Sequence, residues 1–263
     1  MVQDANKGVF DEAEAEKIIN TMQTQSDITG IQFGFDIVGT TEVAFQKYIE
    51  FVSNHSDAPL ILDAMSPSAR MAAAGLVKKM GLANRCIYNS VYKGVTEKEI
   101  INLKESGIES AIVLADNQKD NSIEGKMAIV QEALALAEMA GITKPLIDTA
   151  IPAFAPDMGI AVRTIPVMKE KYGHPVGLGS GNVVTTMGWV KANIAKEFRK
   201  GCVTATNSIM QTVGANYLMF GPAEQAEWVF PAVAVTDVYI ASAAADLGTR
   251  PLDETHPIFK AFL

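Results

Sequence analysis

Short apolar runs alternate along the chain with longer stretches in which apolar residues recur every three or four positions. The first pattern is typical of buried strands and the second of amphipathic helices, so their alternation predicts βα units and a parallel sheet. The predicted strands span 31–36, 58–63, 85–89, 110–116, 144–148, 175–179 and 215–221. The predicted helices span 11–26, 42–55, 67–80, 96–106, 124–140, 157–172, 185–199 and 223–247, with a shorter one near 204–212.

Residues at the ends of these helices support their placement. Ser66 and Thr96 stand where a side chain can accept from exposed backbone amides at a helix start. Glycines stand where helix C-caps are expected, at positions 81, 107, 141 and 173.

The number of predicted strands bears on the fold class. A TIM-type (β/α)8 barrel has eight strands, each followed by its helix, and takes about 250 residues. This chain of 263 residues has seven predicted strands, with a helix at 11–26 ahead of the first. We therefore expect an α/β protein, a TIM-type barrel that lacks its first strand in this chain, as a single domain over residues 1–263. An open doubly wound sheet is the alternative, because the same alternation predicts it.

Polar residues stand where most of the predicted strands end. The carboxyl ends of parallel barrel strands converge on one mouth, where such folds keep their sites. The alternative is that each side chain caps the helix after it, which is easiest to accept for Asp36 and Asp116. The six residues are Asp36, Asp63, Asn89, Asp116, Asp148 and Asn182, the last within the segment PVGLGSGNVV of residues 175–184.

The residue types at this mouth suit a neutral, hydrogen-bonding ligand better than a phosphate. Arg70 and Arg163 fall on helices and are expected at the surface or rim, as is Lys93, for which a Schiff-base role is the alternative. The three histidines and two cysteines have no metal-ligand spacing, so we expect no metal. A carboxylate pairs with two adjacent N–H donors in a fork. A pterin ring presents such a fork through its 2-amino group and its ring N3–H.

Charge and hydropathy limit the classes of partner that we expect for this protein. The net charge of −8 argues against binding to nucleic acid or to anionic membrane surfaces. The apolar stretch 228–245 is interrupted by Pro231 and Asp237, which predicts a buried helix rather than a membrane span. The start of the sequence lacks the layout of a signal peptide, so a cytoplasmic protein is expected.

Several segments together resemble one family. KGVFDEAEAEKIIN, DAPLILDAMSPSAR, GLANRCIYNSVYKGVTEKEI, SAIVLADNQKD and GITKPLIDTAIP are similar, in this order, to the H-subunit family of tetrahydromethanopterin S-methyltransferase. That family includes bacterial relatives that use tetrahydrofolate, such as the pterin methyltransferase of corrinoid-dependent glycine betaine demethylation. Members usually begin with a further strand ahead of the first of these segments, which agrees with the count of seven.

The resemblance implies roles for individual residues. Asp63, Asn89 and Asp148 align with the ligands of the pterin ring, and Asn182 with an asparagine that approaches pterin N5. Asp36 and Asp116 match less clearly. The glycines at 177, 179 and 181 would keep the floor open beneath the ring, which places Gly179 and Ser180 among the cofactor-binding residues.

The resemblance also implies the reaction and its partners. The expected chemistry is methyl transfer between the cobalt of a corrinoid and N5 of tetrahydrofolate or a related reduced pterin. Because no D-x-H-x-x-G corrinoid-binding motif is present, the cobalamin is expected on a separate protein. A homodimer is also expected, with the 226–245 helix as one contact surface and ordinary core packing as the alternative. The rival functions are a non-catalytic subunit that docks the corrinoid protein, and a barrel lyase or aldolase for a phosphorylated substrate.

Overall fold

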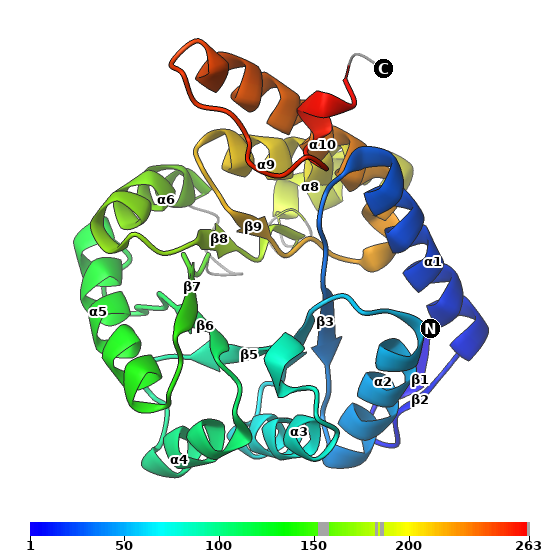
Figure 1. Cartoon of the computed structure of the whole chain (residues 1–263), viewed down its shortest axis with the longest axis vertical. Helices are drawn as coiled ribbons and strands as arrows, with labels where there is room; N and C mark the ends of the chain where they lie inside the picture. The colour runs from blue at the N-terminus through cyan, green and yellow to red at the C-terminus, as the bar shows by residue number, and fades with distance from the viewer. Residues whose placement is uncertain (152–157, 182–183, 185–186, 262–263) are drawn as a thin grey trace. The chain divides into compact units, whose positions relative to one another are not determined.

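The computed structural model describes residues 1–151, 158–181, 184 and 187–261. The chain divides into two compact units, and Figure 1 shows its helices and strands. Unit 1 comprises Met1–Ile19 and Gly34–Ala150, and unit 2 comprises Asn20–Phe33 and Ile151–Leu263. The single domain expected over residues 1–263 stays a prediction.

Unit 1 is built around five parallel strands that lie in sequence order, each joined to the next through a helix (Figure 1). A short antiparallel ribbon of β1 and β2 precedes them. The strands are β1 (Val2–Asp4), β2 (Val9–Phe10), β3 (Phe35–Val38), β4 (Leu60–Asp63), β5 (Cys86–Val91), β6 (Ser110–Leu114) and β7 (Lys144–Asp148). The helices are α1 (Glu12–Thr29, which continues into unit 2), α2 (Glu42–His55), α3 (Pro67–Lys79), the 3₁₀ turn η1 (Ala83–Arg85), α4 (Glu97–Ser106) and α5 (Ile123–Met139).

The two faces of this sheet differ because successive strand residues point to opposite sides. Leu60, Leu62 and Tyr88 are completely buried on the face that the helices cover. Ile61 and Asp63, the alternate residues of β4, are only half-buried on the other face. Burying one large apolar side chain contributes about 1.5–3 kcal/mol, so the helix-covered face holds the core of the unit. The opposite face is where polar side chains can meet a ligand.

Unit 2 contains two further parallel strands, paired Gly177 to Tyr217 and Leu178 to Leu218. Its small core gathers Val184, Val190, Val203 and Val229. Its elements are α6 (Met158–Tyr172), β8 (Val176–Leu178), α8 (Gly188–Asn193), η2 (Lys196–Phe198), α9 (Arg199–Thr212), β9 (Tyr217–Leu218), η3 (Ala223–Gln225), α10 (Ala226–Ala245) and η4 (Pro257–Phe259).

Helix α10 is less buried than its sequence predicts. Val229, Phe230 and Ala234 face the interior, whereas Val235 and Tyr239 are 56% and 74% exposed. The expectation of a fully buried helix is therefore wrong for one of its faces. By length and composition alone, the stretch Ala223–Ala245 would suffice to cross a membrane. This signal is weak, because helices of water-soluble proteins pass the same test.

The predicted order of elements is confirmed in the described residues, which contain seven parallel strands at the predicted places, with α1 ahead of them. The first strand is shifted: β3 runs from Phe35 to Val38 rather than from 31 to 36. Ser66 and Thr96 cap α3 and α4 as expected. The glycines expected at helix ends have left-handed φ values of 66–80° and lie at 81, 107, 141 and 173.

Candidate functional site

Strand register brings four of the predicted site residues onto one face of the unit 1 sheet. Paired residues of neighbouring parallel strands point to the same side, and adjacent strands lie about 4.8 Å apart. The register pairs Val38 with Asp63, Asp63 with Asn89, Asn89 with Ile112, and Leu114 with Asp148. We call this side the polar face; the predicted site residues on it are Asp36, Asp63, Asn89 and Asp148.

Asp63 and Asn89 are direct neighbours on the polar face, and Asp148 lies two strands beyond Asn89 and two residues further along the strand direction. A register shift between Asn89 and Val91 interrupts the regular pairing of β5 with β6, which resumes where Val91 pairs with Val113. Such irregularities re-aim side chains at the end of a strand. The arrangement therefore offers a row of carboxylate and amide groups along one edge of the sheet.

None of the first four strand-end residues caps the helix after it. In every case a Ser or Thr further along the chain accepts the hydrogen bond at the helix start. These caps are Thr41 for α2, Ser66 for α3, Thr96 for α4 and Ser122 for α5. The simplest alternative explanation for Asp36, Asp63, Asn89 and Asp116 is thus removed, and their polar groups remain available for another purpose.

Asp36 lies in an unfavourable setting for a carboxylate. Its side chain reaches solvent, yet desolvation by the surrounding protein and, to a smaller extent, the charge of Asp63 raise its pKa to about 7. Burial also raises the pKa of Asp63, against the lowering effect of Arg70. Carboxyl groups kept where they are costly are typical of functional sites.

Asp36→Asn is expected to stabilise the protein at alkaline pH. The folded-state pKa of Asp36 lies above the ordinary value of 3.8. Its contribution to the free energy of unfolding is therefore fully favourable below about pH 4 and is lost as the pH rises through about 7. Asparagine has no such dependence. Because the side chain is more than a third exposed, we expect a gain of only about 1 kcal/mol at pH 8 and less at pH 5. Urea unfolding at both pH values measures it; parallel pH dependence of the two proteins would contradict the assignment.

Asp148 is held by the turn that follows β7. It is 4% exposed, and its Oδ1 accepts from the backbone N–H of Ala150 at 2.7 Å. Its backbone carbonyl accepts from Ala115 N–H at 2.9 Å. Ala150 has a φ of 49°, a left-handed conformation that costs a residue with a side chain about 1–2 kcal/mol. This turn is thus strained and must be held by its surroundings.

Lys126 of α5 lies behind this turn and was not among the residues singled out from the sequence. It is 1% exposed, and its Nζ donates to the carbonyl oxygens of Thr149 and Ala150, each at 2.8 Å. Burial lowers the pKa of Lys126, and the charges of Asp116 and Asp148 raise it.

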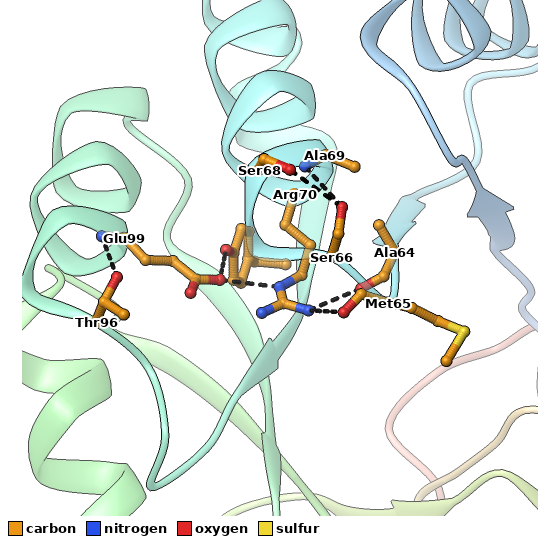
Figure 2. Close-up of polar contacts among 9 residues, drawn as sticks. Ala64, Met65, Ser66, Ser68, Ala69, Arg70, Thr96 and Glu99 are labelled. Carbon is orange, nitrogen blue, oxygen red and sulfur yellow. Dashed lines mark hydrogen bonds and ion pairs between the residues drawn. The ribbon is translucent and has the colours of Figure 1, made fainter. Parts of the chain in front are cut away.

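Arg70 of α3 has a comparable role just past the end of β4, and Figure 2 shows its guanidinium beside Ala64 and Met65. Its Nη1 donates to the Ala64 carbonyl at 2.7 Å, directly after Asp63, and its Nε donates to Glu99 Oε1 at 2.9 Å. The hydroxyl of Tyr88 donates to the same Glu99 oxygen. Burial alone would lower the pKa of Arg70, but the hydrogen bonds and charges of Glu99 and Tyr88 together outweigh it and raise that pKa.

The expected surface position of Arg70 is therefore wrong. Arg70 is 5% exposed and Glu99 is fully buried, and each charge lies against the opposite one in a direct ion pair inside the unit. Arg163 and Lys93 are exposed as predicted, and Lys93 forms an ion pair with Glu132 at 2.8 Å.

The glycine-rich segment of unit 2 is explained in part by close backbone packing. A Cβ built on Gly177 would lie 2.2 Å from the Tyr217 carbonyl oxygen, and one on Gly181 would lie 2.4 Å from the Gly221 nitrogen. Ser180 is fully buried, and its hydroxyl donates to Asn207 Oδ1 at 2.6 Å. This geometry favours a role for Ser180 in holding the turn, with Gly179 half-buried beside it.

The remaining predicted residues are not among those that define the polar face. Asp116 is exposed, two residues past the end of β6. Asn182 lies outside the described residues, and Gly179 and Ser180 belong to unit 2. In the described part of the chain, no group of three or more His, Cys, Asp or Glu residues is placed to hold a metal ion.

Solved structures identify the class of this fold. The chain is similar to dihydropteroate synthase of Xanthomonas albilineans in complex with indole-2-carboxylic acid and 6-chloroguanine (TM-score 0.63, 19% identity, covering 88% of this chain and 86% of that one). The same enzyme in complex with 7,8-dihydropteroate gives a TM-score of 0.61 at 18% identity, covering 88% of each chain. The protein is thus an α/β protein of the TIM-barrel class, as predicted.

Sequence comparison then defines the family. The family model described as tetrahydromethanopterin S-methyltransferase MtrH subunit matches residues 1–252. The tetrahydromethanopterin S-methyltransferase H-subunit from Methanococcus maripaludis is 39% identical, and that from Methanothermobacter thermautotrophicus is 37% identical. Each alignment covers 99% of this chain and 87% of the relative. The chain belongs to this methyltransferase family, which confirms the resemblance found in the sequence.

Proposed function

We propose that this protein catalyses methyl transfer between N5 of a reduced pterin and the cobalt of a corrinoid carried by a separate protein. The corrinoid supplies the chemistry of the methyl–cobalt bond, and the chain supplies binding and orientation. Asp63, Asn89 and Asp148 bind the edge of the pterin ring, with Asp36 beside them on the polar face. Asn182 stabilises the proton state of N5 without adding a charge.

The observation that carries this proposal is the polar face itself. Its carboxylates and amide share one side of the sheet, and Ser and Thr residues have taken over the capping of the following helices. A row of carboxylate and amide groups matches a flat ring with an N–H fork on one edge and acceptors on the other. Family membership supplies the methyltransferase class.

The choice of pterin is part of the proposal. The relatives are named for tetrahydromethanopterin, whereas the resemblance to bacterial members leads us to propose tetrahydrofolate. The two share the ring that the polar face would bind, so calorimetry with each compound in turn distinguishes them.

Asp148→Asn is expected to weaken binding of the reduced pterin by about 2–3 kcal/mol, or about 30- to 150-fold. The substitution removes one charge-assisted fork and presents amide protons to ring donors. Asparagine keeps an oxygen that can accept from Ala150 N–H, so the turn is expected to survive. Isothermal titration calorimetry of wild type and variant measures the effect.

The matched control is Asp57→Asn. Asp57 is a fully exposed carboxylate ahead of β4, at the opposite end of that strand from Asp63. The Asp57→Asn substitution should leave pterin affinity unchanged. Equal affinities for wild type and folded Asp148→Asn would remove Asp148 from the ring-binding set.

Catalysis by the chain itself separates our proposal from its rivals. Single-turnover methyl transfer by the isolated protein, given a methylated corrinoid protein and the pterin, would exclude a purely docking role. Protection against thermal unfolding by phosphate or sulfate, but not by tetrahydrofolate, would instead favour a lyase or aldolase for a phosphorylated substrate.

The proposal includes partners and location. The corrinoid protein would dock where the pterin N5 is presented, and the protein would act in the cytoplasm. We also propose a homodimer, with the exposed apolar residues of α10, among them Val235 and Tyr239, as a contact surface. Light scattering that gives the mass of one chain would overturn the dimer.

A further inference from the structure

Lys126 is a buried cation whose setting differs from that of the other buried cation of unit 1. Arg70 is matched by the carboxylate of Glu99 in a direct ion pair. Among the described residues, the recorded acceptors of Lys126 Nζ are all backbone carbonyls: Thr149 and Ala150 at 2.8 Å and Ala115 at 3.4 Å. A buried charge without a charged partner in contact is costly. Its presence calls for an explanation.

The positions of the three carbonyls that accept from Lys126 indicate its structural role. Ala115 directly follows the end of β6, and Thr149 and Ala150 directly follow the end of β7. One ammonium group therefore ties together the chain just past two neighbouring strand ends. The Ala115 N–H adds a second tie between them, since it donates to the Asp148 carbonyl.

The turn that Lys126 holds is the one that orients Asp148. Asp148 Oδ1 accepts from the Ala150 N–H, so the direction of the carboxylate depends on where that N–H points. Ala150 is left-handed, and an alanine relaxes out of that conformation when its neighbours release it. Two of the hydrogen bonds that oppose this relaxation come from Lys126 to the carbonyls on either side of that N–H.

The charges of Lys126 and of the nearby carboxylates support the same arrangement as the hydrogen bonds. Asp116 and Asp148 both raise the pKa of Lys126, which means that the ammonium and these carboxylates attract one another. Asp148 belongs to the polar face by strand register, whereas Lys126 belongs to helix α5 behind the same strand ends. The cation thus attracts the carboxylate that would meet the ring.

We propose that Lys126 is a positioning residue for Asp148: it locks the Asp148–Ala150 turn and holds the carboxylate in the direction required for ring binding. This inference rests on the proposed pterin site for its functional consequence. Its structural content, the coupling of Lys126 to the Ala150 N–H, does not depend on the ligand.

The first experiment needs no ligand. In Lys126→Met, the amide of Ala150 is expected to exchange with deuterium at least about tenfold faster, because its hydrogen bond to Asp148 is no longer braced. Amides of strand β4 should keep their wild-type rates. Should Lys126→Met fail to fold, Lys126→Gln retains N–H donors without the charge and takes its place. Unchanged protection of Ala150 in the folded variant would overturn the proposal.

The second experiment is a double-mutant cycle on pterin affinity. Lys126→Met should weaken tetrahydrofolate binding about tenfold in the wild-type background and less than twofold in Asp148→Asn. Ser106→Ala is the control for a purely structural loss. Ser106 is 3% exposed, and its hydroxyl bonds at the carboxyl end of α4, next to the start of β6. The Ser106→Ala substitution should lower the free energy of unfolding and leave tetrahydrofolate affinity unchanged.

The outcomes distinguish a failure of the proposed role of Lys126 from a failure of the proposed pterin site. Equal weakening by Lys126→Met in both backgrounds, or no weakening at all, would show that the lysine does not act through Asp148. If Asp148→Asn itself leaves binding unchanged, the pterin site fails, while the exchange rate of the Ala150 amide still decides the role of Lys126.

Discussion

Arg70→Met is expected to destabilise the protein by about 3–5 kcal/mol, because it leaves the buried carboxylate of Glu99 without its cation. Glu99 is fully buried, and the Tyr88 hydroxyl is its other recorded side-chain donor among the described residues. The Ala64 carbonyl would also lose its charged donor. Equilibrium unfolding in urea measures the loss.

Two further variants give this prediction its control. Arg70→Met combined with Glu99→Gln should recover a large part of the loss, since the unpaired charge is removed. Lys144→Met breaks the ion pair with Glu109, in which both side chains are more than half exposed, and should cost less than about 1 kcal/mol. A loss for Arg70→Met as small as that for Lys144→Met would contradict the buried-pair assignment.

The element order could be predicted because it depends on local periodicity. Strand β7 was placed at 144–148 and helix α2 at 42–55, both without error, since each has a regular apolar pattern between clear end signals. Strand β3 was misplaced because the apolar run 31–36 contains Gly34 and the pairing with β4 selects Phe35–Val38. Asp36 consequently lies inside its strand rather than at its end. Tertiary pairing, not propensity, set that register.

The polar face could be predicted from the sequence, but its supports could not be identified in the same way. Asp63, Asn89 and Asp148 stand out because each ends an apolar run, and parallel strands bring such ends together. The buried charges behind them occupy helices, where a charged residue is ordinarily taken as exposed. The interpretation of Arg70 as a surface group followed that rule and was wrong.

The spacing of apolar residues along the two helices nevertheless indicates that Lys126 and Arg70 are buried. Residues three, four and seven positions apart share one side of a helix. Lys126 is followed at that spacing by the buried residues Ile129, Val130 and Ala133, and Arg70 by Ala73, Ala74 and Val77. A charged residue on the apolar stripe of a helix beside a predicted site therefore indicates a support for that site.

Asn182→Ala is expected to lower kcat about 100-fold while changing pterin affinity by less than about threefold. Loss of one positioned, uncharged hydrogen bond to the reacting region typically has a cost of this size. The expectation concerns the transition state, because an interaction made there affects kcat rather than binding. Asn182 lies outside the described residues, so the assignment rests on the aligned GLGSGN segment.

The two residues before position 182 are held by hydrogen bonds within unit 2. Ser180 is anchored through its hydroxyl to Asn207, and the Gly181 N–H donates to the Met219 carbonyl at 3.2 Å. Fixed neighbours favour the catalytic assignment, because a group that acts at one atom of a substrate must be held in position.

The alternative is that Asn182 caps a helix, and two measurements distinguish the roles. A lost cap would lower the free energy of unfolding by about 1 kcal/mol and leave single-turnover methyl transfer nearly normal. A lost catalytic contact would slow the single turnover and leave stability nearly normal. Asn182→Ser sharpens the test, because serine caps helices well but its hydroxyl reaches less far than an amide. Wild-type turnover in Asn182→Ser would end the catalytic assignment, and slow turnover with wild-type stability would establish it.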